Sequence, residues 1–142
     1  MKHQNINNHT RYVPLWHFIT GAFIVSAWGG SIYNLMHIQE GQLIPAIILF
    51  LITSALLSIF WYARWFALRA QDRAIRAEEN LRHYILTGKP LDKHLRTSQI
   101  VALRFASDEE FPGLAQKAAD QKMRSQNIKK EIKNWRSDHH RV

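Results

Sequence analysis

The chain has 142 residues and a formal net charge of +8, from 19 Lys and Arg against 11 Asp and Glu. It contains no cysteine, which excludes disulfides, thiolate zinc sites, iron–sulfur clusters and thiol catalysis. The mean hydropathy is slightly negative because a polar second half dilutes two strongly apolar stretches in the first half.

The first apolar stretch covers residues 14–36 and contains no Asp, Glu, Lys or Arg. Because its length is close to the ~20 residues that cross a bilayer core, we predict a transmembrane helix there. Residues 1–13 form a short segment before it, with Lys2 and Arg11 as cations. A cleaved signal peptide is the alternative interpretation, since these cations resemble an n-region and the VSA sequence at 25–27 resembles a cleavage site. The apolar run continues past Ala27, which favours a retained helix.

The second apolar stretch is uncharged over residues 43–63, and we predict a second transmembrane helix over residues 43–66. Pro45 lies in its first turn, where a missing amide proton costs little. The loop between the helices, residues 37–42, contains no Lys or Arg, whereas cations precede the first helix and follow the second. The positive-inside rule therefore predicts an external loop and both termini in the cytoplasm, as in an inner-membrane protein. Aromatic residues agree with a shared inner interface, namely Trp16, Trp61, Tyr62 and Trp65.

Small residues recur at four-residue spacing on one face of each predicted transmembrane helix, a pattern that lets helices approach closely in lipid. We predict that these faces pack the two helices into a hairpin; the alternative is a face reserved for another subunit. The residues are Ala22, Ser26 and Gly30 in the first helix and Ser54 and Ser58 in the second.

No Gly or Pro interrupts residues 46–87, and Gly88 followed by Pro90 is a typical helix stop. The second helix is therefore predicted to extend into a basic cytoplasmic helical domain, residues 67–142. The charge from residue 64 onward is +7, from 17 cations less 10 acids. Three acid-first pairs four residues apart are expected on the helix surface: Asp72 with Arg76, Glu78 with Arg82 and Glu79 with His83.

Alanines in the extended helix are spaced alternately three and four residues apart, which is typical of a seam that packs against another helix. The alternative is that alanine simply favours a helix and is cheap to expose. The seam is built mostly of alanine and comprises Phe60, Ala63, Ala67, Ala70, Ala74, Ala77, Leu81 and Tyr84.

Two short helices are predicted in the following domain. Thr97 and Ser98 are candidate caps for the first, and Ser107 with Glu110 has capping-box spacing for the second. Their expected buried side chains are Ile100, Leu103 and Phe105 in the first and Phe111, Leu114, Ala115 and Ala118 in the second. Pro112 and Gly113 leave the start of the second helix open.

A last, basic amphipathic helix is predicted over residues 126–136. Three alternatives remain for it: docking on its own domain, lying on anionic lipid, or binding an acidic partner. Its apolar side carries Ile128, Ile132 and Trp135, and its other side carries Lys129, Lys130, Lys133 and Arg136.

No catalytic or cofactor motif is present in the sequence. His17 is the single histidine of the first predicted span and the second has none, so a haem held between them within one chain lacks its second ligand. Gly-rich phosphate loops and His-Glu zinc motifs are absent. We therefore predict a protein without catalytic residues, metal or cofactor. Nucleic-acid binding is compatible with the basic charge but has no recognition motif in its favour.

Three segments carry a resemblance over nearly the whole chain: RAQDRAIRAEENLRHYILTGKPLD from Arg69, IVALRFASDEEFPGLAQKAA, and IKKEIKNWRSDHH. In these segments the chain resembles a family of uncharacterised small bacterial two-span membrane proteins. The resemblance implies a two-span architecture and no established activity, substrate or catalytic residue.

The sequence thus predicts an all-α membrane protein, with a two-helix transmembrane hairpin whose second helix extends into a small cytoplasmic helical domain. We expect a membrane-anchored accessory subunit or adaptor that contacts the lipid bilayer and a protein partner or a second copy. An oligomeric pore or transporter component is the alternative function. A membrane-tethered contact to RNA or the ribosome is a further, less supported alternative.

Overall fold

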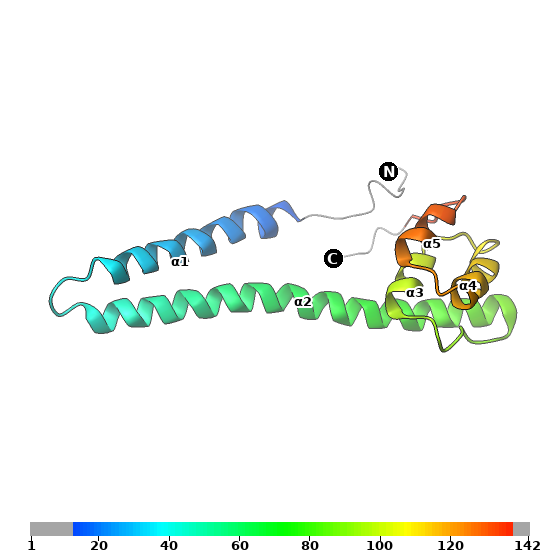
Figure 1. Cartoon of the computed structure of the whole chain (residues 1–142), viewed down its shortest axis with the longest axis horizontal. Coiled ribbons are helices and arrows are strands. Elements are labelled where there is room, and N and C mark those ends of the chain that lie inside the picture. The colour runs from blue at the N-terminus through cyan, green and yellow to red at the C-terminus, as the bar shows by residue number, and fades with distance from the viewer. Residues whose placement is uncertain (1–12, 138–142) are drawn as a thin grey trace. The chain divides into compact units, whose positions relative to one another are not determined.

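The computed structural model describes residues 13–137. Its elements in chain order are a π-helix, η1 (Leu15–Thr20), and five α-helices: α1 (Gly21–Met36), α2 (Leu43–Thr87), α3 (Thr97–Leu103), α4 (Phe111–Asp120) and α5 (Ser125–Glu131) (Figure 1). Within the described residues there is no strand, and one isolated bridge joins Ala106 to Trp135. The predicted all-helical class is confirmed. The chain divides into two compact units, one over Tyr12–Ala67 and one that includes Leu68–Val142.

Two helices have the length and composition needed to cross a membrane. The helical segment Leu15–Met36 has 22 residues and Leu43–Thr87 has 45, and their most apolar 18-residue windows have mean hydropathies of 1.2 and 2.6. Their most apolar windows are only 6% and 11% buried. The rest of the described chain therefore does not cover these apolar side chains, unlike those of a core helix in a soluble domain.

The first apolar helix starts with a π-helical turn that the sequence analysis did not predict. The Gly21 amide donates to the carbonyl oxygen of Trp16, five residues earlier. The Thr20 hydroxyl also donates across five residues, to the carbonyl oxygen of Leu15 at 3.1 Å. These bonds widen the helix locally. The His17 Nδ1 lies 2.9 Å from the carbonyl oxygen of Val13, so the ring bonds the start of its own helix.

The contacts between α1 and the first part of α2 use one residue of the predicted small-residue faces, Ser54, and otherwise involve other side chains. Trp28 Nε1 donates to Ser54 Oγ at 3.1 Å, and the hydroxyls of Ser31 and Thr53 share a buried hydrogen bond of 2.9 Å. Of the predicted packing residues, Ser54 takes part in this contact, whereas the Ser58 hydroxyl donates to the carbonyl oxygen of Ser54 in its own helix.

The prediction that Ala22, Ser26 and Gly30 pack the two helices together is wrong, because all three are exposed. The face of α1 that contacts α2 instead carries Trp28 and Ser31, which form hydrogen bonds with Ser54 and Thr53. Trp16 stacks on Phe60 with ring centroids 4.7 Å apart, which places an aromatic contact at the start of the helical segment.

No other part of the described chain packs on the predicted alanine seam, since Ala67, Ala70, Ala74 and Ala77 are all exposed. A different face of α2 is buried, at Ile75 and Glu79. The physical reason is that the small domain packs on α2 through larger side chains. Exposure within one chain is compatible both with a helix-forming role of these alanines and with a seam for a second chain.

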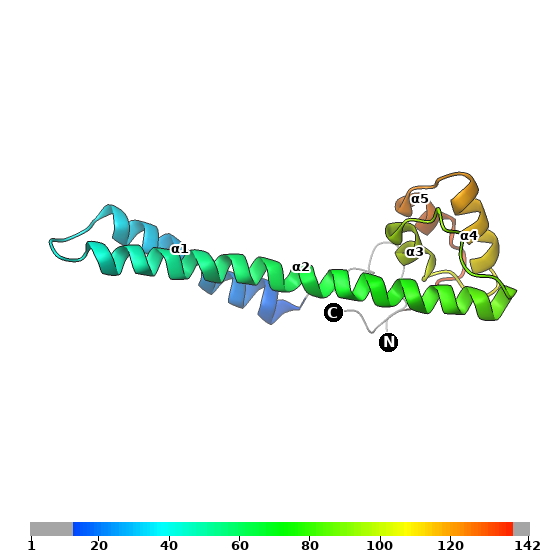
Figure 2. The same cartoon turned by 90° about the horizontal axis from the view of Figure 1, so that it is seen from below.

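The predicted end of α2 is confirmed. Gly88 adopts φ +71°, a left-handed conformation that favours glycine, and its amide donates to the carbonyl oxygen of Tyr84 at 2.8 Å. The three short helices α3, α4 and α5 then gather around the last part of α2 (Figures 1 and 2).

The core of the small domain contains the apolar residues predicted for its first two helices. All seven predicted positions are buried, and the core also includes Leu91, Leu95, Ala102, Ala106, Ile128 and Ile132. The predicted caps are wrong. α3 is preceded by Arg96, whose amide donates to Gln99 Oε1 at 2.7 Å, and the Glu110 carboxylate does not cap α4.

Candidate functional site

The predicted basic helix over residues 126–136 is shorter in the structure. α5 ends at Glu131, and Ile132 already has an extended backbone with ψ 119°. Lys133, Trp135 and Arg136 therefore lie beyond the helix. The prediction of one amphipathic helix that carries all four cations on one face is wrong.

Tertiary hydrogen bonds explain why the helix ends early. The Arg136 amide donates to the carbonyl oxygen of Phe105 at 2.8 Å, and the Ser107 amide donates to that of Asn134 at 3.1 Å. The Glu110 carboxylate accepts the amides of Lys133 and Asn134 at 3.1 and 3.2 Å. Hydrogen bonds to an ionised acceptor are stronger than the neutral bonds of a continued helix. The segment after α5 is therefore held in an extended conformation.

The apolar side chains of this region pack inward. Ile128 and Ile132 are buried, and the Trp135 ring lies over Phe105 with a centroid distance of 5.0 Å. Of the three alternatives for the tail, docking of its apolar side chains on the domain is the one the structure shows.

The four predicted tail cations have different surroundings. Lys129 Nζ lies 5.6 Å from the centroid of the Phe105 ring, and Arg136 Nη1 lies 3.9 Å from Asp108 Oδ1. Lys130 and Lys133 are exposed. We call Lys129, Lys130, Lys133 and Arg136 the tail cations; they form a dispersed basic surface.

A second basic surface, which the sequence analysis did not predict, lies between α2 and the loop that follows it. A groove of about 440 Å³ opens there, lined by charged, polar and apolar side chains. We call it the basic groove. It is lined by Arg73, Arg76, Ala77, Asn80, Pro90, Leu91, Asp92, Lys93 and Ile100.

Side-chain hydrogen bonds hold the loop against α2. Asn80 Oδ1 accepts the Leu91 amide at 2.9 Å, and His83 Nδ1 lies 2.7 Å from the carbonyl oxygen of Lys89. Leu91 is buried in the core of the domain. These contacts return the chain to α2 after Gly88, so that loop residues form one side of the groove.

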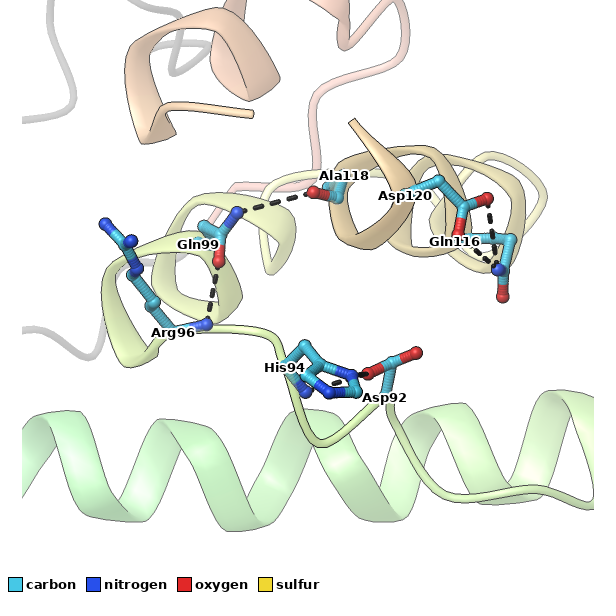
Figure 3. Close-up of polar contacts among 7 residues, drawn as sticks. All are labelled: Asp92, His94, Arg96, Gln99, Gln116, Ala118 and Asp120. Carbon is cyan, nitrogen blue, oxygen red and sulfur yellow. Dashed lines mark hydrogen bonds and ion pairs between the residues drawn. The ribbon is translucent and has the colours of Figure 1, made fainter. Parts of the chain in front are cut away.

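The carboxylate in the groove is engaged by its own loop. Asp92 Oδ1 accepts the His94 amide at 2.7 Å and lies 2.8 Å from His94 Nδ1; Figure 3 shows this pair beside α2. The hydrogen bond from the His94 amide, followed by that from the His94 side chain, lowers the pKa of Asp92. Asp92 is therefore ionised at neutral pH. Its Oδ1 is engaged by the amide and the ring of His94.

The cations of the groove are not neutralised by neighbouring acids. Across residues 13–137 the structure gives no ion pair to Arg73, Arg76 or Lys93, and all three are exposed. The predicted pair of Asp72 with Arg76 does not form. Three cations and one carboxylate leave the lining with a formal charge of 3 − 1 = +2.

Arg82, in contrast, is drawn into a structural network. Its guanidinium lies 3.0 Å from Glu79, 2.6 Å from Asp108 and 2.8 Å from the carbonyl oxygen of Ala106. It also lies over the Phe111 ring, 4.5 Å from the centroid. Arg82 does not form the predicted pair with Glu78. This network joins α2 to the start of α4.

The sequence did not indicate the groove because the reversal at Gly88 separates Lys93 from Arg76, and because Arg76 is expected from its spacing to pair with Asp72 on the helix surface. The combination of two arginines three residues apart, a Gly-x-Pro reversal and a following lysine is the signal that points to it. The described residues contain no group of three or more His, Asp or Glu that could hold a metal ion.

The fold and these surfaces define a class: a small all-helical protein with two long apolar helices and a helical domain that has a basic groove. The chain belongs to a family of unknown function, DUF6526, whose model matches residues 1–142. No curated protein and no solved structure matches the chain. The predicted membership of an uncharacterised family is thus confirmed, and the family assigns no role to any residue.

Proposed function

We propose that this protein is a membrane-anchored accessory subunit or adaptor whose basic helical domain binds an anionic partner or the anionic membrane surface. The observation that carries the proposal is the continuity of α2. This helix runs unbroken from an uncharged apolar stretch into a domain in which Arg73, Arg76 and Lys93 form no ion pair with any other described residue. A hairpin anchor of α1 and the first part of α2 would hold that domain beside a bilayer.

The proposed orientation places both termini on the cytoplasmic side of a bacterial inner membrane. It is supported by the lack of Lys and Arg in residues 37–42 and by the cations that follow the second apolar stretch. Aromatic side chains at this transition support the same boundary. Tyr62, Trp65 and Phe66 contact one another, with ring centroids 5.3 to 6.2 Å apart, and Trp61 is 72% exposed.

The direct test is recovery of the partner. We expect the full-length protein, cross-linked in intact cells and purified from native membranes in mild detergent, to bring down another component in a fixed ratio. Native mass spectrometry gives the stoichiometry. A monomer with nothing attached, before and after cross-linking, contradicts the adaptor proposal.

A homo-oligomer that conducts ions in liposomes would instead favour the second candidate, a pore or transporter component. The observation in favour of this candidate is the exposed face of Ala22, Ser26 and Gly30, which no other part of the described chain covers. A homo-oligomer without flux argues against the pore candidate, because it supplies no path, and is compatible with an adaptor whose partner is a second copy.

The tail cations give a separate prediction for a lipid partner. Replacing Lys129, Lys130, Lys133 and Arg136 by Gln should weaken binding to anionic vesicles by up to ~1 kcal/mol for each cation near the surface, and should flatten the salt dependence. Co-sedimentation with vesicles over a range of salt concentrations measures both effects. If the variant binds as well as the parent at every salt concentration, the tail cations are only solvated surface residues.

A further inference from the structure

We propose that the basic groove is a binding site for a phosphate monoester carried on a small apolar or aromatic body. This inference rests on the proposed function in one respect, namely that the basic domain binds an anionic ligand. It goes further in naming the site and the chemical class of the ligand.

The charge of the groove fits a doubly charged anion. Arg73 and Arg76 come from one face of α2 and Lys93 from the facing loop, so three cations surround one space. A phosphate monoester carries a charge of about −1.5 to −2 at neutral pH, which matches the formal +2 of the lining. A carboxylate or a phosphodiester supplies a single charge. The groove therefore favours a monoester over acidic side chains and over common diester lipids.

The donors of the groove suit phosphate oxygens. Guanidinium groups bind phosphate with two parallel hydrogen bonds, and Lys93 adds a flexible ammonium. Asn80 uses its Oδ1 to accept the Leu91 amide, so its Nδ2 remains as a donor at the same wall. The Asp92 carboxylate would repel an anion, but it is held by the amide and ring of His94.

The apolar side chains of the groove imply a ligand larger than phosphate. Ala77, Pro90, Leu91 and Ile100 form its lining together with the polar groups. The volume of about 440 Å³ falls within the range of small-molecule sites. Leu91 and Ile100 are already buried in the core, whereas Ala77 and Pro90 are exposed. An organic body attached to the phosphate would cover Ala77 and Pro90 and gain affinity from their burial.

The site is also largely formed before a ligand binds. Leu91 and Ile100 belong to the buried core of the domain, and the Asn80 hydrogen bond fixes the loop on α2. Little conformational entropy is then lost on binding, apart from that of the arginine and lysine side chains.

The test uses full-length protein in nanodiscs of neutral phosphatidylcholine, with 1-naphthyl phosphate as the probe in titration calorimetry. We expect 1-naphthyl phosphate to bind at least tenfold more tightly than either inorganic phosphate or 1-naphthol. The groove variant, Arg73→Gln with Arg76→Gln and Lys93→Gln, should lose at least tenfold in affinity. A tail variant with the same charge change, Lys130→Gln with Lys133→Gln and Arg136→Gln, should stay within twofold of the parent.

Single variants keep the test valid if the groove variant does not fold. Lys93 is exposed on the loop, so Lys93→Gln should fold and still weaken binding severalfold. Arg76→Lys keeps the charge but loses the two-bond geometry, and should also weaken binding. Equal losses in the groove and tail variants would indicate general electrostatic attraction and overturn the proposal. Binding of 1-naphthyl phosphate no tighter than that of 1-naphthol would overturn it as well.

The source of the monoester is distinguished by changing the nanodisc lipid. Phosphatidic acid, whose headgroup is a phosphate monoester, should compete with 1-naphthyl phosphate if the ligand is a lipid, whereas phosphatidylglycerol should not. If phosphatidic acid does not compete and the probe still binds through the groove, the ligand is soluble. If 1-naphthyl phosphate does not bind but a partner is recovered from membranes, the groove site is rejected. The adaptor function then stands on the recovered partner.

Discussion

Replacing Arg82 by Met is expected to destabilise the helical domain by about 3 to 5 kcal/mol, because it leaves the Glu79 carboxylate buried without its cation. The two side chains are only 11% and 10% exposed. The substitution also removes the hydrogen bond to the carbonyl oxygen of Ala106. Hydrogen–deuterium exchange of α3, α4 and α5 in the full-length protein measures the loss as faster amide exchange.

Two controls separate this network from a general effect of charge. Arg76→Met removes a cation from an exposed position of the same helix and should change stability by less than about 0.5 kcal/mol. Combining Arg82→Met with Glu79→Leu removes both charges and should recover much of the loss, since the unpaired buried carboxylate is gone. Equal protection in Arg82→Met and the parent would show that the network contributes nothing to stability.

Replacing Phe111 by Ala should destabilise the same domain by about 3 to 5 kcal/mol, the range for removing a buried aromatic side chain. Phe111 is fully buried at the first position of α4. Its ring is packed against His83 with centroids 5.7 Å apart and lies under the Arg82 guanidinium. The substitution leaves a cavity where α4 meets α2. The midpoint of unfolding in denaturant measures the change, followed by tryptophan fluorescence in a background where Trp135 is retained and the other four tryptophans are replaced by Phe.

Tyr84→Ala is the matched control for Phe111→Ala, because Tyr84 is an aromatic residue of α2 that is 55% exposed. Replacing Tyr84 by Ala should lower the free energy of unfolding by much less than Phe111→Ala does. Similar losses for the two variants would mean that Phe111 does not anchor α4 on α2.

The sequence by itself determined where most helices lie. An uncharged run long enough for a bilayer specifies a helix whatever surrounds it, since its backbone bonds are internal. The end of α2 is equally local, because Gly88 supplies a left-handed φ and Pro90 cannot continue the helix. The buried positions of α3 and α4 followed from helical periodicity, which fixes one apolar face.

Only the tertiary structure decided which face of each long helix makes contact and where α5 ends. Small residues and alanines permit close packing but do not require it. The contact between α1 and α2 instead lies at the Ser31–Thr53 hydroxyl pair, and the small domain contacts α2 where Phe111 packs under Arg82. α5 ends where the Glu110 carboxylate accepts the amides of Lys133 and Asn134, which lie more than twenty residues later in the chain. The basic groove likewise depends on the Asn80 bond that returns the loop to α2. Such long-range hydrogen bonds and contacts outweigh local helix propensity, which differs by less than about 1 kcal/mol among ordinary residues.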